Sequence, residues 1–118
     1  IASMKVEKKN VSRWGIFKLK KYIKNNFLIE NVIEKPTIKK APSNYAVIGR
    51  YILPYKIFKI LKKVKHGKDG EIHITDAIKQ LIIEENKFIG HIFSGKYLDC
   101  GTMKGYVNSS LEVSKLKL

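Results

Sequence analysis

An acidic and a basic side chain that stand next to each other could together bind a phosphorylated sugar. Glu34 and Lys35 follow an apolar run, and Pro36 comes directly after them. A carboxylate accepts hydrogen bonds from sugar hydroxyls, and a lysine ammonium neutralises a phosphate as a point charge. At a strand end both side chains can project into the crevice beyond the sheet. The tripeptide alone is more typical of a solvated strand end before a turn-forming proline, so it needs support from elsewhere in the chain.

Two other positions could contact a ligand or a metal. Asp99, which precedes Cys100 and Gly101, is the best metal candidate, because Mg²⁺ typically takes one or two carboxylates together with substrate phosphates and waters. Asp99 is equally placed to cap the helix that follows it. Gly15 lacks a Cβ and would let the backbone approach a ligand closely. The same sequence pattern is equally consistent with a glycine that only makes a turn at the entry to a strand.

The first half of the chain, which must position these residues, reads mainly as strands and turns. Residues 16–19 and 27–33 are apolar runs separated by lysines and by Asn25 and Asn26, a pattern that favours two strands joined by a turn. Pro36 ends the second strand, since proline has no backbone N–H for the ladder. Residues 46–53 form a third apolar run, which predicts a buried strand.

The second half alternates helices with strands. Pro54 favours a helix start, and the apolar residues that follow it fall on one helical face. Thr75 and Thr102 are predicted N-caps of two further helices. Residues 88–93 and 97–98 read as two more strands. The sequence therefore predicts a single α/β domain over residues 1–118.

Length and composition exclude several classes of protein. A chain of 118 residues can bury one modest core, and 44% hydrophobic with 29% charged residues is typical of a globular rather than a disordered protein. No apolar run approaches the roughly 20 residues that a membrane helix needs, and the N-terminus does not read as a secretory signal. The single cysteine, Cys100, rules out an internal disulfide and suits the reducing cytoplasm.

The net charge of +14 raises an alternative, a small lysine-rich module that binds nucleic acid or an anionic surface. Only Arg13 and Arg50 are arginines, the residue preferred for phosphate and base recognition, and the lysines are scattered. The aromatic residues fall at core periodicity instead of forming a stacking platform. Residues 67–70 hold a lysine between glycines but lack P-loop spacing. Nucleic-acid binding is therefore the less favoured function.

An ordered series of short motifs supports the sugar-phosphate interpretation. The motifs are Glu34-Lys35-Pro36, Ala41-Pro42-Ser43-Asn44, Gly49-Arg50-Tyr51, Thr75-Asp76-Ala77-Ile78 and Leu98-Asp99-Cys100-Gly101. In this order and spacing they resemble the C-terminal half of the bacterial UTP–glucose-1-phosphate uridylyltransferases (UDP-glucose pyrophosphorylases). The resemblance runs from about Val6 to Val113. The family's N-terminal Gly-rich nucleotide-binding segment has no counterpart here.

The resemblance implies a fold and a set of site residues. The fold would be the mixed-sheet C-terminal portion of a Rossmann-like nucleotidyltransferase. Gly15 and Glu34 would hold the glucose, and Lys35 would contact the phosphate as the catalytic residue. Asn44 would order the loop beside the sugar, although a turn-capping role is equally consistent with its type. Asp99 would help hold Mg²⁺. Trp14 stands where the family commonly has tyrosine, so the ring is kept and the phenol hydroxyl is lost.

The implied reaction joins glucose 1-phosphate and UTP to give UDP-glucose and pyrophosphate. The uracil pocket, the triphosphate cradle and a second metal carboxylate would lie on the missing nucleotide half, so we expect the chain alone to be inactive. We also expect a sheet edge, exposed where the missing strands would pair, that leads to self-association or to partnership with the missing half. A natural truncation, a proteolytic fragment, part of a longer homo-oligomeric enzyme and a purely structural remnant all remain open, as do the sugar epimer and the nucleotide.

Overall fold

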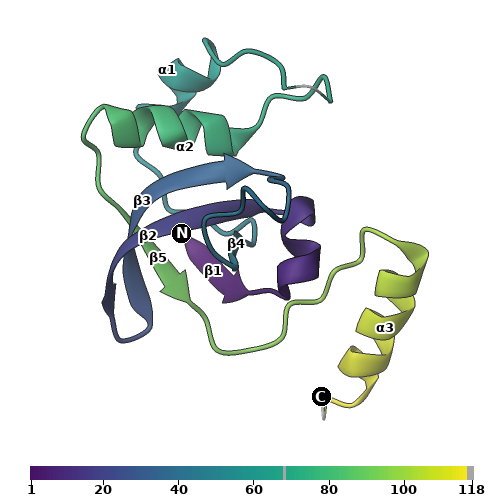
Figure 1. Cartoon of the computed structure of the whole chain (residues 1–118). Helices are drawn as coiled ribbons and strands as arrows, with labels where there is room; N and C mark the ends of the chain where they lie inside the picture. The colour runs from purple at the N-terminus through teal and green to yellow at the C-terminus, as the bar shows by residue number, and fades with distance from the viewer. Residues whose placement is uncertain (68, 117–118) are drawn as a thin grey trace.

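The computed structural model describes residues 1–67 and 69–116 (Figure 1). Its elements follow in the order β1 (Ala2–Lys5), the 3-10 helix η1 (Lys8–Arg13), β2 (Gly15–Ile23), β3 (Asn26–Glu34), β4 (Tyr45–Val47), α1 (Ile57–Leu61), α2 (Ile74–Ile83), β5 (Phe88–Ile92) and α3 (Met103–Ser114). Across the described residues, no helix combines the length and the apolar character that crossing a membrane requires.

The strands form one mixed sheet that closes on itself in the order β1-β4-β2-β3-β5. β2 and β3 make a long antiparallel hairpin, β5 runs antiparallel to β3, and β1 closes the sheet by pairing parallel to β5 and antiparallel to β4. The predicted mixed α/β architecture is confirmed. The expected exposed edge is wrong for the described strands, because each of them has two hydrogen-bonded neighbours.

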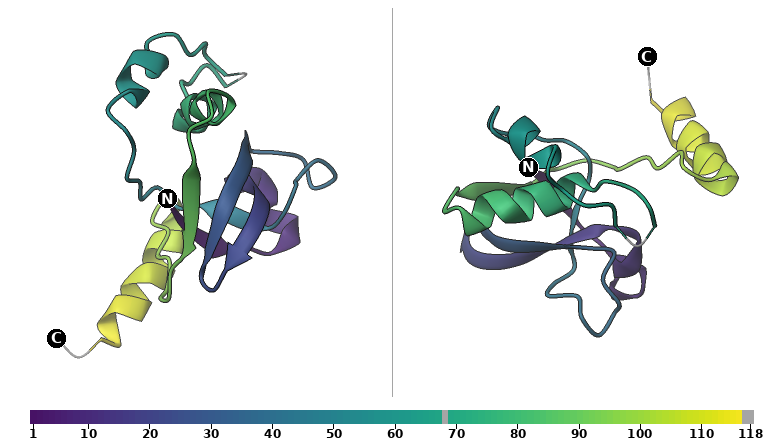
Figure 2. Two further views of the ribbon diagram at one scale, coloured as in Figure 1. Left: turned by 90° about the vertical axis from the view of Figure 1, so that its left-hand side faces the viewer. Right: turned by 90° about the horizontal axis from the view of Figure 1, so that it is seen from above.

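The core lies between the sheet and α2, which packs against β3 (Figures 1 and 2). On β3, Phe27 and Ile29 are two residues apart and both point inward. On α2, Ile78 and Leu81 lie on one face of the helix. All four side chains are almost fully buried. Gly90 on β5 faces Phe27 so closely that an added Cβ would lie 2.1 Å from the ring. Only a glycine therefore fits at this point of the sheet.

Several strand predictions are wrong in extent. The expected buried strand over residues 46–53 is only the three-residue β4, because Gly49 turns the backbone to φ +72° and Ile52 beyond it is 93% exposed. Residues 97–98 form no strand and lie in the segment that leads to α3. β1 and η1 are not predicted at all, since neither carries a clear periodic pattern.

The helices agree better with prediction. The carbonyl of Pro54 accepts a hydrogen bond from the Ile57 N–H at 2.9 Å, so proline stands just before α1 as expected. Thr102 caps α3 as predicted, because its hydroxyl oxygen accepts from the Gly105 N–H at 3.0 Å. Thr75 is not the N-cap of α2. The helix begins at Ile74, so that His73, two residues before Thr75, is in the cap position.

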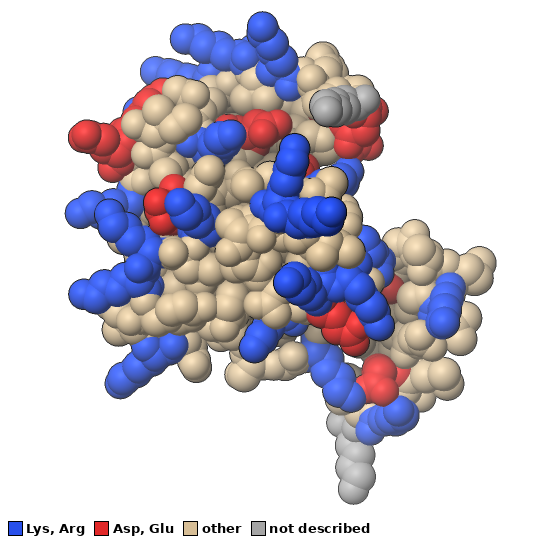
Figure 3. Space-filling model, in the orientation of Figure 1, with Lys and Arg blue, Asp and Glu red and all other residues tan. Residues whose placement is uncertain are grey.

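α3 stands away from the closed sheet (Figures 1 and 2), and Ser109 is its one buried residue within the described range. Tyr106 and Leu111 on this helix are more than half exposed. Lysine and arginine side chains are spread over the face drawn in Figure 3, with acidic and uncharged residues between them. This distribution agrees with the scattered lysines of the sequence.

Candidate functional site

The hairpin register brings together two residues that the sequence singled out. Gly15 opens β2 and pairs with Glu34, which ends β3. From α2, the Thr75 hydroxyl donates a hydrogen bond to Glu34 Oε2 at 2.7 Å. A Cβ on Gly15 would lie 2.9 Å from the Thr75 methyl and 3.0 Å from Glu34 Oε2. Glycine is therefore required here, and the Glu34 carboxylate is held in one orientation.

A cavity of about 350 Å³ opens at this point, lined by Trp14, Gly15, Glu34, Tyr51 and Thr75 among others. Its volume lies within the range of small-molecule sites. Burial, and secondarily the charge of Glu34, raises the pKa of Tyr51, so its phenol stays protonated and can donate a hydrogen bond. The cavity thus offers one fixed carboxylate, one phenol hydroxyl and an aromatic wall, a suitable lining for a polyhydroxylated ring.

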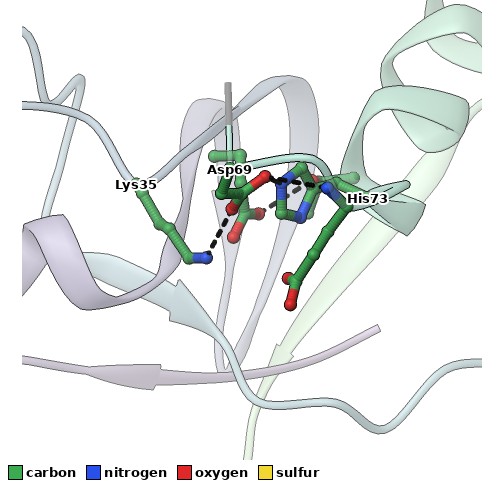
Figure 4. A network of polar contacts seen from close by, with 6 residues as sticks. Lys35, Asp69 and His73 are labelled. Atoms are coloured by element: carbon green, nitrogen blue, oxygen red, sulfur yellow. Dashed lines mark hydrogen bonds and ion pairs between the residues drawn. The ribbon is translucent and has the colours of Figure 1, made fainter. Parts of the chain in front are cut away.

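Lys35 comes directly after Glu34, the last residue of β3, and is not itself among the residues that line this cavity. Its backbone takes φ +42°, a left-handed conformation that is unusual for a residue with a side chain, and its N–H donates to the Trp14 carbonyl at 3.0 Å. Such outliers cluster at functional sites. The ammonium donates to Asp69 Oδ2 at 3.0 Å, and this contact raises the pKa of Lys35 (Figure 4).

Asp69 belongs to a small cluster with Glu71 and His73. Its Oδ1 accepts from the Glu71 N–H at 3.2 Å and lies 2.9 Å from Nε2 of His73. The hydrogen bonds from Lys35 and then His73 hold the pKa of Asp69 well below its usual range, so it is ionised. The three side chains place candidate ligand atoms within 4.8 Å of one another. Because the Lys35 ammonium already faces them, the cluster is better suited to hold that ammonium than a metal ion.

Asp99 lies in the segment between β5 and α3, not at the end of a strand. Its Oδ2 accepts from Arg13 Nη2 at 2.9 Å and its Oδ1 from the Gly101 N–H at 3.0 Å. Arg13 lines both the cavity at Glu34 and a second cavity of about 590 Å³ that includes Asp99, so the two are neighbours. Each oxygen keeps a free lone pair, so the carboxylate suits one ligand of Mg²⁺. Magnesium binding there stays a prediction.

Asn44 has a different position from the other candidates. Its side-chain amide donates to the Val6 carbonyl at 3.1 Å, and its own carbonyl accepts from the Val6 N–H at 2.9 Å. These bonds tie the chain before β4 to the end of β1. Asn44 is not among the residues that line the cavity at Glu34.

A larger cavity of about 730 Å³ lies between α1 and α2, lined by Lys56, Lys59, Lys63 and Glu84 among others. Lys56 and Glu84 already form an ion pair at 2.6 Å. The lysines stand on the exposed side of α1 with their stems along the surface. The smaller cavity is therefore the better candidate, since there a fixed carboxylate, a strained backbone and a close glycine converge.

Sequence reasoning missed three residues of this site: Tyr51, Asp69 and Thr75. The sequence predicts Thr75 only as a helix N-cap, and only the docking of α2 against β3 shows its bond to Glu34. Asp69 lay in a glycine-flanked segment that was tested only for P-loop spacing. Its role depends on a contact with Lys35, 34 residues away along the chain.

Comparison with known proteins finds relatives over nearly the whole chain. The family defined as nucleotidyl transferase matches residues 1–115. The UTP–glucose-1-phosphate uridylyltransferase of Pseudomonas aeruginosa is 34% identical over 110 residues, which cover 93% of this chain and 39% of that protein. A uridylyltransferase of Streptococcus pyogenes is 38% identical over 113 residues, which cover 95% of this chain and 38% of that protein.

Solved structures give the same result. A UDP-glucose pyrophosphorylase in complex with UDP-glucose superposes with a TM-score of 0.90 at 39% identity, over 98% of this chain and 43% of that one. The UTP-bound enzyme from Acinetobacter baumannii has a TM-score of 0.78 at 30% identity, over 96% of this chain and 38% of that one. The chain thus spans about two-fifths of the length of the relatives that it matches.

Proposed function

This chain belongs to the nucleotidyl transferase family, and we propose that it supplies the sugar-phosphate side of an enzyme that transfers uridylyl from UTP to glucose 1-phosphate. The observation that carries the proposal is the convergence of Gly15, Glu34 and Thr75 at one cavity. Lys35 follows Glu34 directly, and its N–H donates to the carbonyl of Trp14, which lines the same cavity. The relatives' printed activity, UTP–glucose-1-phosphate uridylyltransferase, is consistent with a site of this chemistry.

In the proposed reaction an oxygen of the sugar phosphate attacks the α-phosphorus of UTP, and pyrophosphate leaves. The residues of this chain act by positioning and by charge neutralisation. Glu34, fixed by Thr75, accepts hydrogen bonds from the sugar hydroxyls, and Gly15 lets the ring lie against the backbone. Lys35 neutralises the phosphate and so favours its approach to a second anion.

Magnesium fits the same proposal through Asp99. When bound, Mg²⁺ would reduce the repulsion between the phosphates, with Asp99 as one of its ligands. Arg13, which now pairs with Asp99 at 2.9 Å, would keep the carboxylate oriented toward the neighbouring cavity. The contribution of this chain to the metal is therefore one oriented carboxylate.

We further propose that the chain corresponds to the C-terminal part of such an enzyme, that it acts in the cytoplasm, and that it does not catalyse uridylyl transfer alone. The length of the chain, about two-fifths of the matched relatives, supports the last of these proposals. The nucleotide would then be bound by the remaining part of a longer chain or by a partner. Association of copies with one another stays a prediction.

The test combines binding with turnover. Pyrophosphate release from UTP, glucose 1-phosphate and Mg²⁺ should be absent with this chain alone, while calorimetry should detect weak UDP-glucose binding. Lys35→Ala should weaken that binding roughly tenfold or more, as expected for loss of a charge-assisted bond. Lys18→Ala is the matched control, because Lys18 also forms an exposed ion pair, with Glu30 at 3.1 Å. Equal losses in the two variants would contradict the proposed site.

A further inference from the structure

The ammonium that would bind the phosphate already has an anionic partner within the chain. Lys35 Nζ lies 3.0 Å from Asp69 Oδ2, and the two side chains are 46% and 37% exposed. An ion pair this exposed is weak, so it forms and breaks at little cost. A phosphate that approaches Lys35 must therefore compete with the Asp69 carboxylate, and it can displace that carboxylate.

The loop before α2 is built to present Asp69 at this place. The Gly67 N–H donates to the Glu71 carbonyl at 2.7 Å, which closes the loop. A Cβ on Gly67 would lie 2.9 Å from the His73 ring and 3.0 Å from Asp69 Oδ1. Glycine at this position thus allows the loop to fold tightly against the Asp69–His73 contact. Oδ1 of Asp69 is held by Glu71 and His73, while Oδ2 faces Lys35 (Figure 4).

Asp69 keeps other partners when Lys35 leaves it. Oδ1 retains the Glu71 N–H at 3.2 Å and His73 Nε2 at 2.9 Å, and these contacts do not involve the oxygen that binds the ammonium. Release of Lys35 therefore leaves no isolated carboxylate, which would be costly near a second anion. Lys35 gains in the exchange, since a doubly charged phosphate attracts it more strongly than a single carboxylate does.

We propose that Asp69 is a specificity-determining residue, an internal carboxylate that a sugar phosphate must displace from Lys35. The inference rests on the proposed function, because it concerns the same phosphate site. A phosphorylated sugar replaces the Asp69–Lys35 pair with a stronger one. A neutral sugar cannot replace it and leaves the pair intact. Asp69 thus restricts binding at Lys35 to ligands with enough negative charge to displace its carboxylate.

Titration of the chain with glucose 1-phosphate and with glucose, followed by NMR, tests this. Asp69→Asn keeps an acceptor for the Glu71 N–H but removes the competing charge, and should tighten glucose 1-phosphate binding about two- to fivefold, the range expected for an exposed ion pair. Glucose binding should be unchanged. Glu71→Gln is the matched control, since it removes a neighbouring charge but no bond to Lys35. Asp69→Ser, which keeps a side-chain oxygen near the Glu71 N–H and carries no charge, provides a second variant should the asparagine disturb the loop.

The outcomes separate the two proposals. A larger gain in Asp69→Asn than in Glu71→Gln, confined to the phosphorylated sugar, supports displacement. Equal gains in the two variants would mean that Asp69 acts only as one of several nearby negative charges. That result would overturn the inference and leave the proposed function standing. Equal gains for glucose would overturn it as well. If no variant, nor the native chain, binds glucose 1-phosphate, the proposed sugar-phosphate site fails and the inference fails with it.

Discussion

Two helices of similar length, α2 with 10 residues and α3 with 12, are attached to this molecule by different forces. α2 buries four side chains, and three of them, Ala77, Ile78 and Leu81, belong to the core under β3. α3 buries only Ser109 within the described range, and an ion pair between Lys96 and Glu112 ties it to the preceding segment. Apolar burial holds α2 firmly, whereas exposed ion pairs contribute little.

This difference divides the candidate site into a rigid part and an adjustable part. Gly15, Glu34 and Thr75 lie on the closed sheet and on α2, so their geometry is set before any ligand arrives. Asp99 lies on the segment that carries α3 and is oriented by an exposed pair with Arg13. The proposed sugar pocket would therefore be preorganised, which reduces the cost of binding. The proposed metal ligand can shift with its segment.

The largest expected effect contrasts the two regions in stability. Phe27→Ala should lower the free energy of unfolding by about 3–5 kcal/mol, because it removes a buried ring from the core. Leu111→Ala on α3, where the leucine is 56% exposed, should change it by no more than about 0.5 kcal/mol. Urea denaturation of both variants measures the difference. Similar losses would mean that α3 carries core packing and that the contrast is wrong.

A smaller effect is expected inside the rigid part. Thr75→Val keeps the side-chain shape but removes the 2.7 Å hydrogen bond to Glu34, which should cost about 1.5–3 kcal/mol because the acceptor is charged and Thr75 is buried. UDP-glucose binding should weaken as Glu34 loses its fixed orientation. Thr75→Ser, which keeps the hydroxyl, serves as the control in both calorimetry and denaturation. If serine and valine behave alike, Thr75 acts only through packing.

The smallest effect is a local pH dependence in α3. Lys115 and then Lys96 lower the pKa of Glu112 from 4.5 to about 2. A carboxyl whose pKa is lowered by folding stabilises the structure above its unfolded value, and that contribution is lost as the pH falls from about 4.5 through about 2. Hydrogen-exchange protection in α3, taken relative to the intrinsic exchange rate at each pH, should therefore fall over this window. Glu112→Gln should abolish the pH dependence, and its persistence would point to another group.

Residue type and short-range spacing predicted the features that depend only on neighbouring residues, such as strand ends and helix caps. The end of the second strand before Pro36 and the Thr102 cap follow from residue type and spacing, and the structure confirms them. The closure of the sheet could not be predicted in this way. It depends on β1 pairing with β5, as in the register of Ala2 with His91, and no short-range pattern reports a contact at that separation.

The candidate site shows the same limit. Glu34 and Lys35 are predicted from a motif and from their charges, and Gly15 is predicted from its lack of a Cβ. Thr75 and Asp69 become site residues only through tertiary packing, one by the docking of α2 and the other by a closed loop. Their residue types alone are equally typical of helix starts and turns.

The most direct measurement is a map of backbone amide NMR shifts as glucose 1-phosphate is added to the chain. A sugar-phosphate site on the closed sheet predicts the largest changes at Gly15, Lys35 and Thr75, with α3 nearly unaffected. Changes gathered instead around Lys59 and Lys63, at the larger cavity between α1 and α2, would mean that the anion binds to scattered lysines. The site proposed at Glu34 would then be contradicted.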